Sequence, residues 1–420
     1  MESNTTIPRA GLHAPSVGTV RGLPPPDAAA LVHSARVTTA IRDAIHAAGG
    51  WIPFRDFMRI ALYAPGLGYY AAGAQKIGTF PQDASDFVTA PEISPLFGYA
   101  LANQFAEVLE ISGGEVLELG AGSGKLAANL LARLDALQIK CRYSILEPSA
   151  ELRERQRATI GHLAPRHLSK VGWLDALPAT WTGVIFGNEV LDALPVEWLM
   201  TKDGRRFRRG VTSNDSGELR LVERELTEAL PGGKAAAEAK HECAMRDALR
   251  ERFPAGDYLS ELNPEGEALS ATLASLLAAG MLLWIDYGFP AREYYHPQRV
   301  EGTLMCHYRH RAHADPLLWP GLQDITAHVD FSALARATCD AGAELAGYSG
   351  QASFLIDCGI ADLLLRSGTP GSSEFVRASA AVQRLLSPAE MGELFKVIAF
   401  TRRIDVPLRG FTTGDRSHRL

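Results

Sequence analysis

One stretch of this chain, residues 115–126 (EVLELGAGSGKL), constrains the fold more than any other. Its short apolar run ends at Leu119 and predicts a buried central strand of a parallel sheet. The glycines that follow remove Cβ atoms where the backbone must turn sharply and where a ligand approaches closely; they are Gly120, Gly122 and Gly124. The leucines downstream recur at helical spacing. The stretch therefore predicts a strand, a glycine turn and a helix, the opening unit of an α/β Rossmann-like fold.

The spacing of this turn separates three classes of cofactor site. A P-loop needs a glycine at the position of Leu119 and Ser or Thr at the position of Leu126, so it is excluded. The dinucleotide fingerprint needs a third glycine where Lys125 stands, which disfavours NAD and FAD. An acidic residue before G-x-G-x-G, here Glu118, resembles the first motif of class I S-adenosylmethionine (SAM) methyltransferases. We therefore expect the turn to pass close to the methionine part of SAM, with Glu118 nearby.

The next two predicted strands supply candidates for the nucleoside part of that cofactor. The first ends in Glu147, where a carboxylate that accepts two hydroxyl protons suits a ribose diol. The alternative is a solvated acid at the end of a strand. The second carries Trp173 and Leu174, which we expect to flank the adenine ring, although a tryptophan packed in the core is an equal alternative.

A fourth predicted strand, residues 184–186, leads into Asn188 and Glu189 at the sheet edge where ligands bind. Base-specific amino methyltransferases carry two prolines and an aromatic residue here, and this chain does not. A carboxylate instead suits a cationic guanidinium, which paired carboxylates hold bidentately. We expect Asn188 to contact SAM and Glu189 to be the principal catalytic residue, with Asp192 as a partner. In the alternative, Glu189 only bonds the backbone of its own turn.

A loop-rich stretch, residues 63–98, precedes the glycine turn and is dense in glycine and aromatic residues. In a Rossmann-like domain such a stretch would lie over the ligand. We expect Thr89 at the cofactor and Glu92 as a further acidic residue near the acceptor. A structural lid, packed by its own aromatic side chains, remains open as the alternative.

Six motifs in this order are similar to the MidA family of SAM-dependent methyltransferases, a bacterial and mitochondrial group that includes the human complex I assembly factor 7. They span residues 61–70, 86–94, 117–124, 187–196, 285–288 and 324–331. The resemblance implies a class I methyltransferase fold with a seven-stranded, mostly parallel sheet. For the mitochondrial member it implies symmetric dimethylation of an arginine on a complex I core subunit.

Composition and charge narrow the class of protein. Apolar content of 46% and charged content of 21% over 420 residues are those of a soluble globular protein of one large or two ordinary domains. The net charge of −6 gives no support to a nucleic-acid partner, and we interpret the basic run at 205–209 as one solvated face of a hairpin. No apolar run reaches about 18 residues, so no membrane insertion is expected.

Cysteine and histidine usage argues against structural metal or disulfides. The five cysteines are scattered without a C-x-x-C, which suits a reducing compartment, and we expect a cytoplasmic bacterial protein. His307, His310 and His313 have ligand-like spacing, but no fourth ligand lies close by in the sequence, so no metal is expected.

These observations divide the chain as follows: a disordered tail at 1–33, a helical and lid segment at 34–114, a methyltransferase core at 115–195 and 278–405, and a hairpin-helix insertion at 196–277. The preferred function is SAM-dependent methylation of a protein arginine. The alternatives are a small-molecule methyltransferase and a non-catalytic assembly factor whose SAM site only stabilises the fold.

Overall fold

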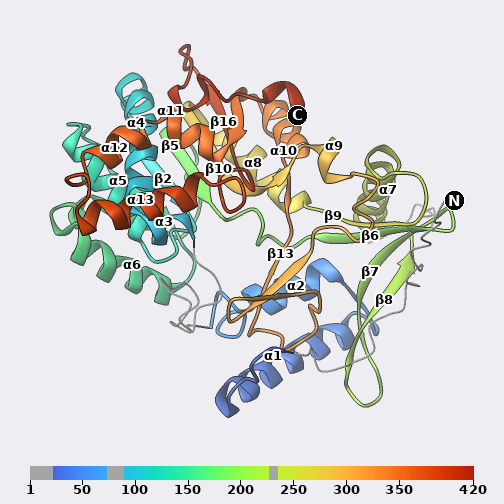
Figure 1. The fold of residues 1–420 in the computed structure, drawn as a ribbon. Coiled ribbons are helices and arrows are strands. Elements are labelled where there is room, and N and C mark those ends of the chain that lie inside the picture. The colour runs from blue at the N-terminus through green and yellow to red at the C-terminus, as the bar shows by residue number, and fades with distance from the viewer. Residues whose placement is uncertain (1–21, 73–88, 227–234) are drawn as a thin grey trace, which may run out of the picture.

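A computed structural model describes residues 22–72, 89–226 and 235–420 (Figure 1). The expected tail up to residue 21 and the part of the lid at 73–88 lie outside the described residues. Figure 1 shows two groups of elements: a sheet covered by helices, and a second group built from the N-terminal helices and the strands of the insertion.

The central sheet has the strand order β15-β16-β10-β5-β2-β3-β4. From β4 to β10 neighbouring strands are parallel, whereas β16 runs antiparallel to both β10 and β15. The seven strands are β2 (Glu115–Leu119), β3 (Tyr143–Leu146), β4 (Val171–Leu174), β5 (Trp181–Asn188), β10 (Leu277–Phe289), β15 (Glu344–Gly350) and β16 (Phe395–Arg402). The predicted seven-stranded, mostly parallel sheet is confirmed, with a short additional strand, β14 (Val329–Asp330), paired to β10.

Apolar side chains are buried on both faces of this sheet, which explains the nearly continuous apolar runs of its strands. In β2, Val116 belongs to the cluster under one helical layer and Leu117 to the cluster under the other. The first layer contains α3 (Ala90–Ile93), α4 (Pro95–Ser112), α5 (Lys125–Ala136), α6 (Ala150–Leu163), α11 (Gln351–Asp357), α12 (Ile360–Leu365) and α13 (Ser373–Leu386). The second contains α8 (Pro264–Leu276) and α10 (Phe331–Asp340). The methyltransferase core therefore begins before residue 115, because α4 belongs to the first of these two helical layers.

The first helix begins earlier than the sequence pattern indicated. We expected a tail to residue 33 and a helix over 34–48, but α1 spans Ala28–Ala47. Asp27 caps it, since its carboxylate accepts a hydrogen bond of 2.8 Å from the Ala30 N–H. Together with α2 (Phe54–Tyr63), α1 packs against the insertion rather than against the central sheet.

The insertion forms a second sheet in the order β1-β7-β6-β9, with β8 paired to β7. Its strands are β1 (Ile52–Pro53), β6 (Glu197–Lys202), β7 (Arg205–Ser213), β8 (Leu219–Glu225) and β9 (Tyr258–Leu262), and α7 (Ala235–Arg252) follows β8. The predicted hairpin turn is confirmed: Asp203 and Gly204 both have positive φ, of 50° and 74°. The basic run lies on β7 as expected, but Arg208 is buried rather than solvated.

A third, small sheet carries the three histidines. Its strands are β11 (Met305–Tyr308), β12 (Arg311–His313) and β13 (Asp324–Thr326), and α9 (Ala291–Tyr294) precedes it. Over the described ranges no group of His, Cys, Asp or Glu side chains is arranged to hold a metal ion. The five cysteines are free thiols. In the same ranges no helix is both long and apolar enough to cross a bilayer.

Candidate cofactor and acceptor site

The glycine turn has the conformation that its sequence predicts. Gly120, Gly122 and Gly124 all have positive φ, of 64°, 52° and 85°. A Cβ on Gly124 would lie 2.9 Å from the Cα of Gln156, and one on Gly120 would lie 3.1 Å from Cγ2 of Val190. The turn is therefore closed to larger residues both by its backbone conformation and by its neighbours.

Glu147 is a fixed carboxylate at the end of β3. It is 5% exposed, and burial raises its pKa. One oxygen accepts from the N–H of Ser149 at 3.0 Å, and the other accepts from Nε2 of Gln156 at 3.2 Å. Each oxygen retains a second lone pair, so the group is oriented yet able to accept further hydrogen bonds.

The predicted adenine slot is tied to the same residues. The indole N–H of Trp173 donates to Oε1 of Gln156 at 2.8 Å, and the Arg157 guanidinium lies 4.4 Å from the centre of the Trp173 ring. The carbonyl of Leu174 accepts from Nη2 of Arg153 at 2.8 Å. Trp173 is partly buried against the core, so its two proposed roles, packing and ring contact, are compatible.

Glu118 lies within the sheet rather than in the turn. It is 2% exposed and accepts a hydrogen bond of 2.8 Å from the hydroxyl of Tyr143 on the neighbouring strand. Burial raises its pKa to about 8. In this position Glu118 supports the strand that leads into the glycine turn.

Glu92 belongs to the short helix α3, and Thr89 precedes this helix as its N-cap residue, without a side-chain capping bond. The buried carboxylate of Glu92 accepts hydrogen bonds from the hydroxyl of Ser123 and the ammonium of Lys125. Glu92 is thus joined to the glycine turn, and its expected place near the acceptor stays a prediction.

Glu189 stands directly after β5 in a left-handed backbone conformation, with φ of 54°. Its N–H donates to the carbonyl of Ile285 at 2.9 Å, and its carboxylate accepts from Nδ2 of Asn188 at 3.0 Å. Burial, with the charge of Asp192 second, raises the pKa of Glu189 to about 8. Oδ1 of Asn188 is buried and finds no hydrogen-bond partner within the described ranges. Non-glycine residues with this backbone strain concentrate at functional sites.

Asp286 holds the turn that follows Glu189. One of its oxygens accepts from three consecutive backbone N–H groups, those of Val190, Leu191 and Asp192, at 3.2, 2.9 and 3.2 Å. Asp286 belongs to the motif at 285–288, but the sequence did not assign it this contact. Its side chain is 1% exposed, and burial raises its pKa well above the ordinary range.

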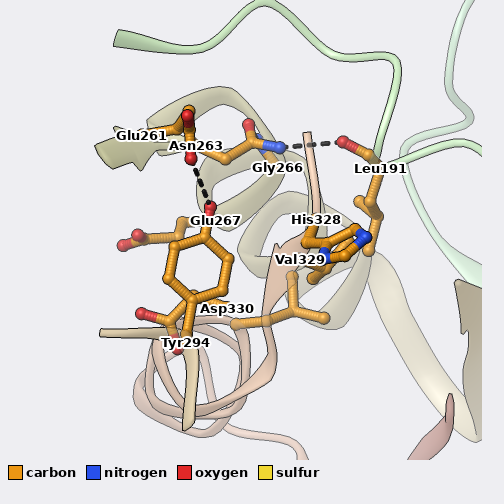
Figure 2. A pocket seen from close by; sticks show the side chains of 10 residues that line it. Leu191, Glu261, Asn263, Gly266, Glu267, Tyr294, His328, Val329 and Asp330 are labelled. Atoms are coloured by element: carbon orange, nitrogen blue, oxygen red, sulfur yellow. Dashed lines mark hydrogen bonds between the residues drawn. The ribbon is translucent and has the colours of Figure 1, made fainter. Parts of the chain in front are cut away.

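A pocket lies behind the same turn and is shown in Figure 2. There the Asn263 amide donates to the Leu191 carbonyl at 2.8 Å, and the Tyr294 hydroxyl donates to Glu261 at 3.3 Å. His328 lines the pocket, and burial lowers its pKa to about 4, so the ring is neutral at physiological pH. None of the predicted cofactor residues lines this pocket.

Asp192 is the second carboxylate of the turn. It is 5% exposed and accepts a hydrogen bond from the Tyr287 hydroxyl through Oδ2, while Oδ1 is buried and has no partner in the described part of the chain. Burial raises the pKa of Asp192 to about 6. An unsatisfied acceptor in this position suits a ligand that brings N–H donors.

Three further residues on this side were not predicted. The Tyr63 hydroxyl donates to the Ala193 carbonyl at 2.9 Å, and the Tyr70 hydroxyl donates to Asp324 at 2.9 Å. The Tyr63 and Tyr70 rings stack with centroids 5.5 Å apart. The buried charge of Asp324 also contributes to raising the pKa of Glu189. The paired tyrosines in a glycine-rich motif were the available signal, but nothing in the sequence connected them to Asp324.

Comparison with known proteins identifies the family to which this chain is similar. Residues 100–349 match the family model described as S-adenosyl-L-methionine-dependent methyltransferase. The mitochondrial protein arginine methyltransferase NDUFAF7 of Mus musculus is 29% identical over 390 residues, covering 83% of this chain and 81% of that protein. The Homo sapiens protein of the same name is 28% identical over 386 residues, covering 83% of this chain and 80% of the relative.

Solved structures agree with the fold. A Burkholderia thailandensis protein crystallised with bound S-adenosyl-homocysteine is 48% identical, with a TM-score of 0.87, and the match covers 95% of this chain and all of that one. A native crystal structure from the same organism gives 47% identity and a TM-score of 0.84 over the same coverage.

Proposed function

This chain belongs to the family of S-adenosyl-L-methionine-dependent methyltransferases, and from that premise we propose that it methylates an arginine side chain of a partner protein. An arginine on a respiratory complex I subunit is the acceptor that the resemblance to the MidA family favours. The observation that carries the proposal is the unsatisfied, buried Oδ1 of Asp192, beside the strained residue Glu189.

The residues at the carboxyl ends of β2, β3 and β5 fit the cofactor. SAM supplies, when bound, a methyl group activated on a sulfonium. The three glycines of the turn present no side chain to the cofactor, Glu147 retains lone pairs for two ribose hydroxyls, and the unpaired Oδ1 of Asn188 can accept from a further donor. We assign Trp173 and Leu174 to the adenine side. Glu118, Glu92 and Thr89 would act less directly, through the turn and the lid.

The acceptor side is acidic and partly aromatic, which suits a guanidinium. A guanidinium is planar, permanently charged and carries five N–H donors. Glu189 and Asp192 would hold it by charge-assisted hydrogen bonds and orient one nitrogen for attack. The stacked rings of Tyr63 and Tyr70 would exclude water from one side, and Asp324 would add a third negative charge.

The experiment that tests this proposal uses the full chain and methyl-labelled SAM. The purified protein is incubated with an extract of cells that lack its gene, and labelled protein is hydrolysed and analysed for methylarginine. The test variant is E189Q, which replaces the carboxyl group at the site by an amide, and the control variant is E110Q, which makes the same change at an exposed residue on α4.

Methylarginine with wild type and E110Q, and its loss with E189Q, is the expected result. Label confined to low-mass products would replace the protein substrate by a small molecule. Label on lysine or glutamine would retain a protein substrate and overturn the choice of arginine. No transfer by a protein that binds S-adenosyl-homocysteine would favour the assembly-factor alternative.

A further inference from the structure

Gln156 on α6 connects all three parts of the cofactor side, and no prediction from the sequence singled it out. Its Nε2 donates to the Gly122 carbonyl at 3.3 Å and to Glu147 at 3.2 Å. Its Oε1 accepts from the indole N–H of Trp173 at 2.8 Å. One amide therefore touches the glycine turn, the ribose carboxylate and the adenine slot.

This amide makes three hydrogen bonds and is enclosed. Gln156 has no exposed surface, and two bonds from Nε2 with one to Oε1 use both of its donors and one of its acceptor sites. The backbone around it is equally close, because a Cβ on Gly124 would lie 2.9 Å from the Gln156 Cα. A buried amide that hydrogen-bonds several groups at once rigidifies the groups it joins.

We propose that Gln156 is a positioning residue for SAM, which fixes Glu147, the glycine turn and Trp173 in one arrangement before the cofactor binds. The inference concerns the cofactor and does not depend on the identity of the methyl acceptor. Supporting hydrogen bonds of this kind set the orientation of ligand-binding groups, and their loss lowers ligand affinity while leaving the direct contacts chemically intact.

The chemical orientation of the amide is specific, and that gives a sharp test. In Q156E a carboxylate oxygen replaces Nε2 and faces both the Glu147 carboxylate and the Gly122 carbonyl. Two like charges at that separation repel, so one carboxyl must retain a proton for the arrangement to form. The other charged groups around Glu147 are Glu118, which increases the repulsion, and Arg153, which reduces it. Arg157 lies on the Trp173 ring.

The measurement is the Kd of S-adenosyl-homocysteine, determined calorimetrically with the full chain between pH 6 and pH 8. Q156L should weaken binding on the order of tenfold at pH 7.5, because three hydrogen bonds are lost around the site. Q156E should bind weakly at pH 8 and more tightly as the pH falls, because added protons remove the repulsion. Wild type should show no tightening at low pH, since an ionised Glu147 is the better acceptor for ribose.

Q383L is the matched control, because Gln383 is an exposed glutamine on α13. It should bind like wild type. W173F keeps an aromatic ring and removes the bond to Oε1 together with part of the indole, while both Nε2 bonds of Gln156 stay. It should give a smaller loss than Q156L, and it also serves if Q156L does not fold. Wild-type affinity in Q156L, or in W173F should Q156L not fold, would overturn the proposal. The proposal would also be overturned if the affinity of Q156E depended on pH in the same way as that of wild type. A purely structural role of Gln156 would not reverse the direction of this pH dependence.

Discussion

The Tyr287 hydroxyl donates a hydrogen bond to Asp192 across the turn that carries Glu189. Both residues are at the carboxyl edge of the central sheet, Tyr287 in β10 and Asp192 four residues beyond β5. The bond leaves the other Asp192 oxygen buried and without a partner among the described residues. One oxygen of this carboxylate is thus held by Tyr287, and the other is an unsatisfied hydrogen-bond acceptor.

We predict that Y287F shifts the acidic limb of the pH–rate profile. Burial raises the pKa of Asp192 to about 6, and the Tyr287 bond opposes that rise. Removing the hydroxyl should raise this pKa further, so activity should fall at a higher pH by about one pH unit. Y348F removes a buried hydroxyl on β15 and should leave the profile unchanged. An unshifted limb in Y287F would show that Asp192 does not have to be ionised.

Glu189 should make the binding of the methyl acceptor depend on pH between neutral pH and pH 8, above the acidic limb set by Asp192. Its pKa of about 8 means that it is protonated in the free enzyme at neutral pH. An arginine acceptor stays charged and binds the ionised form, so its KM should fall as pH rises towards 8, by up to about tenfold per unit.

E189Q tests this dependence directly. It should flatten the KM profile and lower kcat on the order of 100-fold, because the acceptor is no longer oriented. Affinity for S-adenosyl-homocysteine should be unchanged. A KM that still follows pH in E189Q would assign the dependence to another group, with Asp324 the first to test.

Gly124 should not tolerate a side chain, whereas Gly113 should tolerate a small one. Both have positive φ, of 85° and 65°, but only a Cβ on Gly124 meets a neighbour, at 2.9 Å from Gln156 Cα. G113A should cost about 1–2 kcal/mol of unfolding free energy from backbone strain alone and keep ligand affinity. G124A should lose measurable calorimetric binding of S-adenosyl-homocysteine. Equal affinities would mean that α6 moves freely away from the turn.

A buried ion pair in the insertion should dominate its stability. Arg208 bonds both oxygens of Glu197 at 2.6 and 2.7 Å, and neither side chain is exposed beyond 5%. R208A leaves a buried carboxylate with fewer partners and should lower the unfolding free energy in urea by about 3 kcal/mol. R205A, on the same strand, breaks an exposed pair with Glu225 and should change it little.

The same pair predicts the direction of acid sensitivity. Burial alone would raise the pKa of Glu197, but bonds from His241 and Arg208 and the charge of Arg55 lower it to about 2. A carboxyl group whose pKa is lower in the folded than in the unfolded protein stabilises the fold at pH values above the unfolded-state pKa. That contribution is lost as pH falls from about 4.5 towards 2. R208A should therefore show a shallower loss of stability over this range than wild type.

How well the sequence predicts a structural feature depends on how far apart in the chain the contacting residues are. The strand, turn and helix around Gly122 follow from local pattern, and so does the capped start of α8 after Asn263. Local pattern missed the start of α1, because an extended, proline-rich segment ends directly at the Asp27 cap.

Contacts between distant segments were not predictable in the same way. The sequence did not connect Glu92 to Ser123 and Lys125, some thirty positions along the chain, which bind its carboxylate at the glycine turn. Asp324 meets Tyr70 only because β13 is brought back beside the N-terminal helices. The sequence indicates which carboxylates carry chemistry, and folding decides which of them share one site.

The insertion leaves the central sheet after β5 and returns to it at β10, and these two strands are neighbours. Because the two strands are parallel, the chain leaves at the carboxyl end of β5, and α8 returns it to the start of β10. The helix α2, which carries Tyr63, packs against the insertion. The residues assigned to the cofactor lie on the central sheet and its helices, whereas the aromatic wall depends on a helix that packs against the insertion. A change in the insertion would therefore alter the support of Tyr63 and leave the glycine turn, Glu147 and Gln156 in place.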